Sequence, residues 1–461
     1  MRHLVTCVLL LGCGGAPPQP PSPSPGEARD SADASESPDE PEGREAGPCR
    51  YEALEPGLGI LADHAWTCPT RVAGLYARAP SGAAWVTLQP WDGVSTAGPV
   101  ALWSIGPGAP VRVAVGDEPS PVAALAATDE GPELLLDTDG GLDRLRRVDG
   151  RWVRDRVAPP LGEHVLLAFV PGDEPRAIAH PDATGPGRAR LLTGRGDAWL
   201  AAEERGAGSS GAGSSGAYRR YDGAMTPRGP LRTVALPEDR SPSAPDARLG
   251  TVGAVRLVFE DVRWPAYPFV AWSDAAGAPA LGWQSRGEEA GVAVPAGDGR
   301  FVRWRVAPRG CAPRVPAHVP DPPEARTYVT CRMGGPSGLA VARDGSVWVA
   351  LDLVEHTRRV IEHLRTVRGC DRCPPQMDEE VLHDGRVRRR WIARVTRREL
   401  AFVASVPPTG GSVTARLDAI RGVRLWLPSE RGARLLEVDP AARFEVPELV
   451  VERVGEVTPG S

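Results

Sequence analysis

The stretch "GGPSGLAVARDGSVWVALD", residues 334–352, decides the fold class. Two apolar runs flank Asp344-Gly345, which is a strong hairpin signal because a type I′ turn needs positive φ at both central residues. A two-residue turn places Val341 opposite Trp348 on the neighbouring strand. One face then carries Leu339, Val341, Trp348 and Ala350, and the other carries Ala340, Ala342, Val347 and Val349. Both faces are apolar, so both must be covered by other parts of the protein.

Antiparallel sheets that are covered on both faces are typical of β-propeller blades. The same strand-turn-strand form recurs along the chain, at residues 74–89, 124–139, 164–180, 269–283 and 400–417. A second element, a turn followed by alternating apolar and Arg residues, begins at Asp149, Asp298 and Asp384, and we expect it at the outer rim of a blade. The sequence therefore predicts an all-β protein with a single β-propeller of about six or seven four-stranded blades over residues 48–456.

Residues of the opening stretch also fill a repeat pattern, P-x-G-[apolar]-A-x-x-x-D-G-x-[apolar]-W-[apolar]. The residues that fill it are Pro336, Gly338, Ala340, Asp344, Gly345 and Trp348. In this respect the stretch resembles the repeats of NHL and streptogramin-lyase propellers, and the resemblance implies the propeller fold. Streptogramin lyases use a His and a Glu, but the resemblance assigns no residue of this chain to their catalytic motif.

Two segments interrupt the repeats. The segment "GAGSSGAGSSGA", residues 206–217, predicts a flexible loop within one propeller, although it could instead divide two domains. In "DLVEHTRRVIEHLRTV", residues 352–367, apolar residues recur near helical spacing. This spacing favours a short inserted helix over the alternative, outer strands with poor alternation.

The N-terminus reads "MRHLVTCVLLLGCGG". A basic start precedes an apolar core, residues 4–11, which is too short to span a bilayer but suits an export signal. Residues 10–13, "LLGC", resemble the lipobox of bacterial lipoproteins and depart from it at Leu11, where a smaller residue is usual. We therefore expect residues 1–12 to be a signal peptide, Cys13 to carry a lipid, and the protein to be anchored to the bacterial cell envelope. The alternative is an ordinary secretion signal with an incidental cysteine.

Residues 13–47 are rich in Pro, Ser and acidic residues, a composition that predicts a disordered linker between the anchor and the folded body. Between residues 26 and 46, eight acidic residues stand against two arginines, a net charge of −6. The whole chain carries −5, so the rest is nearly neutral. Nucleic-acid binding is not expected, because it depends on neutralising phosphates.

Six cysteines remain besides Cys7 and Cys13, and an even number in an exported protein favours disulfides. Their local grouping suggests the pairs Cys49–Cys68, Cys311–Cys331 and Cys370–Cys373. The sequence "GCDRC" allows two alternatives for the last pair. Cys370 and Cys373 could bind zinc together with His363 and His383, or form a redox pair.

The best polar cluster for chemistry lies in residues 352–367. Glu355-His356 and Glu362-His363 are seven residues apart and would share one face of a helix, where they could perform acid–base work. The simpler interpretation is a solvated helix face. The chain has no G-x-S-x-G, H-E-x-x-H or P-loop motif, and we expect no metal site and no cofactor.

Two functions therefore remain open. The first is a monomeric envelope lipoprotein whose propeller is a binding or scaffold module for a protein or glycan partner. The alternative is a propeller enzyme, a lyase or hydrolase, with His or acidic residues near the central channel. A propeller fold by itself does not decide between them.

Overall fold

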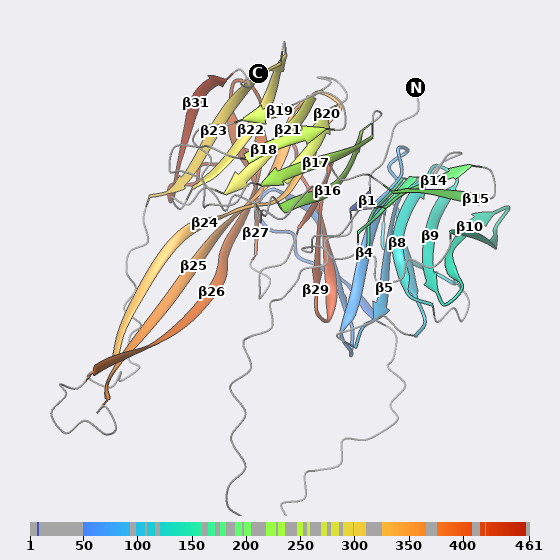
Figure 1. Ribbon diagram of the computed structural model, residues 1–461, viewed down its shortest axis with the longest axis horizontal. Coiled ribbons are helices and arrows are strands. Elements are labelled where there is room, and N and C mark those ends of the chain that lie inside the picture. The colour runs from blue at the N-terminus through green and yellow to red at the C-terminus, as the bar shows by residue number, and fades with distance from the viewer. Residues whose placement is uncertain are drawn as a thin grey trace, which may run out of the picture.

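The computed structural model describes residues 7–8, 49–92, 98–106, 108–115, 120–158, 165–170, 176–180, 190–195, 198–203, 218–226, 229–235, 247–251, 256–258, 269–273, 278–284, 289–297, 299–309, 325–365, 376–407, 415–419 and 421–457. Within these ranges the regular secondary structure consists of β-strands only (Figure 1). The strands form seven antiparallel sheets, so the predicted all-β class is confirmed.

The first four sheets follow the order of the chain. Sheet 1 contains β4 (Val72–Arg78), β5 (Ala84–Pro90), β6 (Ala101–Ile105) and β7 (Val111–Val113). Sheet 2 contains β8 (Val122–Thr128), β9 (Gly131–Thr138), β10 (Gly141–Val148) and β11 (Arg151–Ala158). Sheet 3 contains β12 (Val165–Val170), β13 (Arg176–His180), β14 (Arg190–Arg195) and β15 (Ala198–Glu203). Sheet 4 contains β16 (Tyr218–Thr226), β17 (Gly229–Ala235), β18 (Ala247–Thr251) and β19 (Arg256–Val258).

The remaining sheets include strands from more distant parts of the chain. Sheet 5 contains β20 (Phe269–Ser273), β21 (Ala278–Gln284), β22 (Ala290–Gly297), β23 (Arg300–Pro308) and the C-terminal β31 (Leu449–Val457). Sheet 6 contains β24 (Ala325–Val341), β25 (Val347–Arg365), β26 (Gln376–Val395) and β27 (Leu400–Val406). A short strand, β1 (Cys7–Val8), pairs with β12 of sheet 3. It lies in the segment that we expect to be cleaved from the mature protein.

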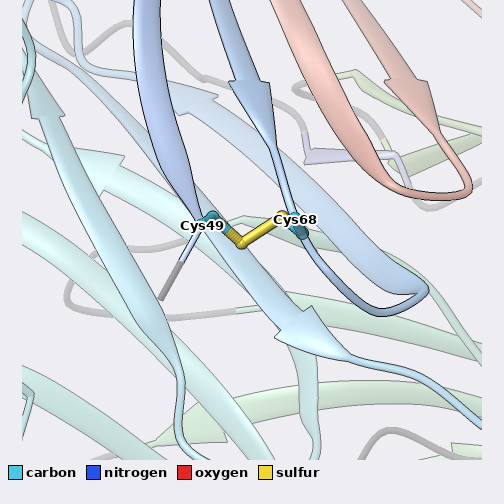
Figure 2. The surroundings of a disulfide bond; sticks show 2 residues. All are labelled: Cys49 and Cys68. Atoms are coloured by element: carbon cyan, nitrogen blue, oxygen red, sulfur yellow. A yellow bond between two sulfur atoms is a disulfide. The ribbon is translucent and has the colours of Figure 1, made fainter. Parts of the chain in front are cut away.

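Sheet 7 joins the two ends of the folded body. It contains β2 (Arg50–Leu54), β3 (Ile60–Thr67), β30 (Gly432–Val438), β29 (Val423–Ser429) and β28 (Arg416–Asp418), in that spatial order. The N-terminal β3 pairs with the C-terminal β30, with His64 opposite Leu435. A disulfide joins Cys49, just before β2, to Cys68, just after β3, as the cysteine grouping predicts (Figure 2). Cys331 is also disulfide-bonded, whereas Cys311, Cys370 and Cys373 lie outside the described residues.

Neighbouring sheets contact one another in chain order. One strand of each sheet contacts one strand of the next, from β4 through β8, β12, β16, β20 and β24 to β28. Sheet 7 in turn contacts β4 of sheet 1 through β29 and β30. Each sheet therefore has two neighbours, and the sheet built from both chain ends lies between the sixth and the first.

The opening stretch forms the hairpin between β24 and β25, but its predicted register is wrong by one residue. Val341 lies opposite Val347, and Trp348 lies opposite Ala340. The amide of Ala342 donates to the carbonyl of Ser346, so the loop has three residues, with only Gly345 at positive φ (+79°). Asp344 caps this loop by accepting hydrogen bonds from the backbone N–H and the hydroxyl of Ser346. The dipeptide therefore builds a three-residue loop with a glycine bulge instead of a type I′ turn.

Both faces of the hairpin are buried, as the sequence predicts, but the shift redistributes the side chains. Val347, Val349 and Leu351 belong to a core shared with sheet 5. Ala340, Trp348 and Ala350 belong to a second core, shared with sheet 7. Trp348 therefore fills the same face as the small alanines and not the opposite face. Close approach to sheet 7 also explains Gly338, where a Cβ atom would lie 2.9 Å from the carbonyl oxygen of Ala415.

The predicted helix at residues 352–367 is wrong. Residues 352–365 continue strand β25, which pairs with β24 on one side and β26 on the other. Thr357, Val360 and Ile361 are β-branched and suit a strand. The alternative of outer strands with poor alternation is closer to the structure, because hydrogen bonds to two neighbouring strands outweigh a weak helical spacing.

Two other predicted units differ in place. Residues 400–417 do not form a hairpin, because β27 ends sheet 6 and β28 begins sheet 7. The Arg-rich strand expected at the rim from Asp384 lies inside β26, the third strand of its sheet, and Trp391 is buried there. The other four predicted hairpins correspond to the pairs β4–β5, β8–β9, β12–β13 and β20–β21. The Gly/Ser segment 206–217 lies outside the described residues.

Candidate functional site: a projecting three-stranded arm

Three strands of sheet 6 continue well beyond the sheet. We define the arm as residues 325–330 of β24, 356–365 of β25 and 376–385 of β26. Thr330, His356 and Gly385 lie side by side at its base, according to the strand register. Ten residues of β25 lie in the arm, which gives it a length of about 33 Å at 3.3 Å per residue. Figure 1 shows this ribbon extending away from the other sheets.

Buried core residues of sheet 6 lie close to the base of the arm. Cys331, Leu353 and Trp391 belong to the core shared with sheet 5 and are nearly inaccessible to solvent. The strands of the arm pair with one another along its length, from Ala325 opposite Ile361 and Arg365 opposite Gln376 to the base.

The candidate catalytic residues all lie on β25, but the strand separates them. Successive positions of a strand alternate between its two faces, so positions 355 and 356 lie on opposite faces, as do positions 362 and 363. Residues seven apart also lie on opposite faces and are about 23 Å apart. The single cluster that a helix would have formed is not present.

The strand register gives the cross-strand neighbours of these candidates. Glu355 forms an ion pair with Arg388 of β26, with 3.7 Å between Oε2 and Nη1. In the register, Glu362 lies opposite Glu379, and His363 lies opposite Asp378. The strand therefore removes the helical cluster of these four residues, and the alternative of a lyase or hydrolase with residues near the central channel stays a prediction.

The zinc alternative loses its geometry as well. His363 lies opposite Asp378, so His383 is five residues farther along the neighbouring strand. Five residues correspond to about 16 Å, whereas ligands of one zinc ion lie about 2 Å from the metal. Among the described residues no group of three or more His, Cys, Asp or Glu side chains could hold a metal ion.

Asp352, which precedes the arm, is a structural carboxylate. Arg390 donates from Nε to Oδ1 at 2.6 Å and from Nη2 to Oδ2 at 2.7 Å, and the Ser337 hydroxyl donates to Oδ1 at 3.1 Å. Asp352 and Arg390 are 6% and 3% exposed. Both carboxylate oxygens are thus engaged by a buried, bidentate cation, which fixes the base of the arm and keeps Asp352 from acting as an accessible base.

A second buried polar cluster joins sheets 1 and 7. The Tyr76 hydroxyl on β4 donates to Oδ2 of Asp418 on β28 at 3.0 Å, and Nη1 of Arg78 lies 3.5 Å from the same oxygen. Arg416 donates to the backbone carbonyl of Tyr76. Burial, followed by the charge of Asp418, raises the pKa of Tyr76 well above its usual value, so Tyr76 remains a neutral donor. Sequence reasoning missed this cluster, because its main partners are 342 residues apart and neither lies in a local motif.

Aromatic side chains also gather between sheets 7 and 1. The ring centroids of Tyr51 and Trp66 are 5.7 Å apart, and those of Trp66 and Trp103 are 6.2 Å apart. Both tryptophans are buried, so the cluster is interior packing and not an exposed platform for sugars. The Tyr51 hydroxyl lies 3.0 Å from Nδ1 of His64.

His64 should make stability depend on pH. Burial lowers the pKa of His64, with Arg424 acting in the same direction and Glu437 and Asp63 acting against it. Between the folded pKa and the unfolded value of about 6.5, the unfolded chain binds more protons. The contribution of neutral His64 to the free energy of unfolding should therefore be fully present above about pH 6.5. It should be lost as the pH falls toward the folded pKa. We expect the melting temperature to fall more between pH 7.5 and 5.5 in the wild type than in His64→Gln. Equal decreases in melting temperature in the two proteins would contradict a lowered pKa of His64.

Neither a protein-family model nor a curated protein matches the sequence. In the part of the chain that the structure describes, no helix is long and apolar enough to span a membrane.

Proposed function

We propose that the seven sheets are the blades of one closed β-propeller. The cyclic order of sheet contacts supports this arrangement, since sheet 7 touches both sheet 6 and sheet 1. The pairing of β3 with β30 would then close the ring by joining the two ends of the chain in one blade. Seven is within the number that the sequence repeats predict.

We further propose that the mature protein is a lipoprotein of the bacterial cell envelope. The "LLGC" sequence after a short apolar core supports lipidation of Cys13. Residues 14–47 would then be the tether that separates the membrane from the folded body, whose first covalent fixed point is Cys49.

The function that the geometry supports best is partner binding, with the arm as the contact element. The main observation is that β24, β25 and β26, which have 17, 19 and 20 residues, project well away from the other sheets (Figure 1). The arm places a large strand-built surface at a distance from the body, where a protein or glycan partner can reach it. A propeller presents such an element rigidly, and this suits a binding or scaffold module.

Truncation of the arm should remove binding and leave the fold intact. Thr357 lies opposite Asp384, so residues 358–383 can be replaced by Asn-Gly, which closes a two-residue hairpin turn. A photo-crosslinking residue at Arg359 should yield an adduct with a partner in intact cells, whereas one at Val111, which is 64% exposed on sheet 1, should not. The truncated protein should melt within a few degrees of the wild type.

Three results would contradict parts of this proposal. If the residue at Arg359 gives no adduct in cells under any growth condition, partner binding through the arm is refuted. An adduct from Val111 alone would place the contact on the body. A large drop in melting temperature after truncation would show that the arm is part of the structural core.

Lipidation makes a separate prediction. A labelled fatty acid should be incorporated into the wild type and into Cys7→Ser, but not into Cys13→Ser, because only Cys13 follows the lipobox-like residues. Globomycin, which inhibits the lipoprotein signal peptidase, should cause the unprocessed wild type to accumulate. Labelling that survives Cys13→Ser, or processing that ignores globomycin, would contradict the anchor.

A further inference from the structure

Two strands of the fold share one sequence motif. Residues 149–157 read "DGRWVRDRV" and include most of β11, and residues 298–306 read "DGRFVRWRV" and include most of β23. Each is the fourth strand of its sheet, in sheets 2 and 5 respectively. The motif pairs Arg151 with Arg300, Val153 with Val302, and Arg156 with Arg305.

In sheet 5 this motif carries an additional strand. The C-terminal β31 pairs antiparallel with β23 along nearly its whole length. Glu456 accepts a hydrogen bond from Arg300 at 3.1 Å, and Glu452 accepts one from Nε of Arg305 at 3.1 Å. The chain therefore contains an example of what this motif binds: an extended segment with glutamates four residues apart.

In sheet 2 the same motif ends the sheet. Among the described residues β11 pairs with β10 and with no other strand. Val153 is 36% exposed, whereas its counterpart Val302 is fully buried in the core that sheet 5 shares with sheet 6. Arg151 is exposed as well, and the side chain of Arg156 is 54% exposed. Among the described strands, β11 also contacts β15 of sheet 3 but has no paired strand on its outer edge such as β31 provides in sheet 5.

The charge of this edge is positive. Residues 141–158 contain six arginines and three aspartates. Asp143 accepts hydrogen bonds from both Arg154 and Arg156. Desolvation raises the pKa of Asp143, but these two arginines outweigh it and lower the pKa overall, so the carboxylate stays charged. One carboxylate shared by two guanidinium groups leaves an excess of cationic charge along the edge.

We propose that the outer edge of sheet 2 binds an extended acidic segment of a partner protein as an added antiparallel strand. Such strand addition takes its affinity from backbone hydrogen bonds and its specificity from side chains along the edge. The β11 strand of a second copy of the protein is not expected to bind at this edge. Antiparallel pairing of two Arg-rich strands would place like charges together. The edge is separate from the arm, so this proposal does not depend on the arm's role.

A labelled peptide with the sequence LVVERVGEV, residues 449–457, tests the proposal. It is titrated by fluorescence anisotropy into the full mature chain, and hydrogen exchange is followed in residues 151–158 and 300–308. We expect saturable binding that slows exchange in residues 151–158. The affinity should fall about tenfold in Arg151→Glu and for a peptide that carries Glu452→Gln and Glu456→Gln, as lost charge pairs predict. Arg305→Glu on β23 is the matched control and should leave this binding unchanged.

Other outcomes overturn the proposal. The arginines could instead protect the edge from association, since charged residues often do so on edge strands. In that case the peptide would not bind. Protection confined to residues 300–308 would mean that the peptide had replaced β31, and equal binding of the Glu→Gln peptide would remove the acidic requirement. Arg151 is exposed, so a folding defect in its variant is not expected, and a melting curve verifies this.

Discussion

Asp352→Ala is expected to destabilise the protein by about 3–5 kcal/mol, because it leaves the guanidinium of Arg390 buried without its carboxylate. Arg390 is 3% exposed and donates two hydrogen bonds to Asp352, and both would be lost. Urea unfolding monitored by circular dichroism measures the change.

A double variant tests whether the unpaired charge of Arg390 causes this loss of stability. The double variant Asp352→Leu with Arg390→Met removes both charges and should recover most of the loss, since apolar replacement of a buried pair is often close to neutral. Asp344→Ala, at the exposed turn of the same hairpin, breaks an ion pair with Arg394 and the two hydrogen bonds from Ser346, and should cost about 1–2 kcal/mol, less than Asp352→Ala. A double variant as unstable as Asp352→Ala would contradict the explanation.

Trp348→Asp is expected to prevent folding at 25 °C. Trp348 is 3% exposed and fills the core between sheets 6 and 7. Truncation of a buried tryptophan alone costs about 3–5 kcal/mol, and a buried carboxylate without a partner adds to this. The sum approaches the whole stability of a typical protein, about 5–15 kcal/mol.

The control for Trp348→Asp is the same type of substitution at an exposed apolar residue. Val111→Asp, at a position that is 64% exposed, should change the free energy of unfolding by less than about 0.5 kcal/mol. Trp348→Phe should lie between the two, because it keeps an aromatic ring in the core. A folded, soluble Trp348→Asp protein with native circular dichroism would show that the face of the hairpin near sheet 7 is less closely packed than the structure indicates.

The hairpin at residues 334–352 shows how far the sequence predicts the fold. Asp344-Gly345 and two apolar runs were enough to predict a hairpin covered on both faces. They were not enough to predict its register, because Asp344 can cap Ser346 in a three-residue loop as well as occupy a two-residue turn. One residue of difference moved Trp348 to the other face.

The arm shows why the candidate site could not be predicted. Apolar residues in β25 happen to recur near helical spacing, and the pairing with β24 and β26 that makes the segment a strand is not visible in a local window. The helical interpretation brought Glu355 and Glu362 together, whereas the strand separates them. The partner of Asp352 was equally hidden, since Arg390 is 38 residues away in the chain.

The disulfide between Cys49 and Cys68 determines how mechanical load would enter the folded body. A pull on the chain from the side of residue 48 reaches Cys49 and passes through the sulfur atoms directly to Cys68. The hairpin of β2 and β3 lies inside the closed covalent loop and is not stretched. The load continues toward β4, where Cys68 and Val72 donate backbone hydrogen bonds to Arg431 and Glu430. A force applied to the folded body through this end of the chain would therefore not separate β3 from β30.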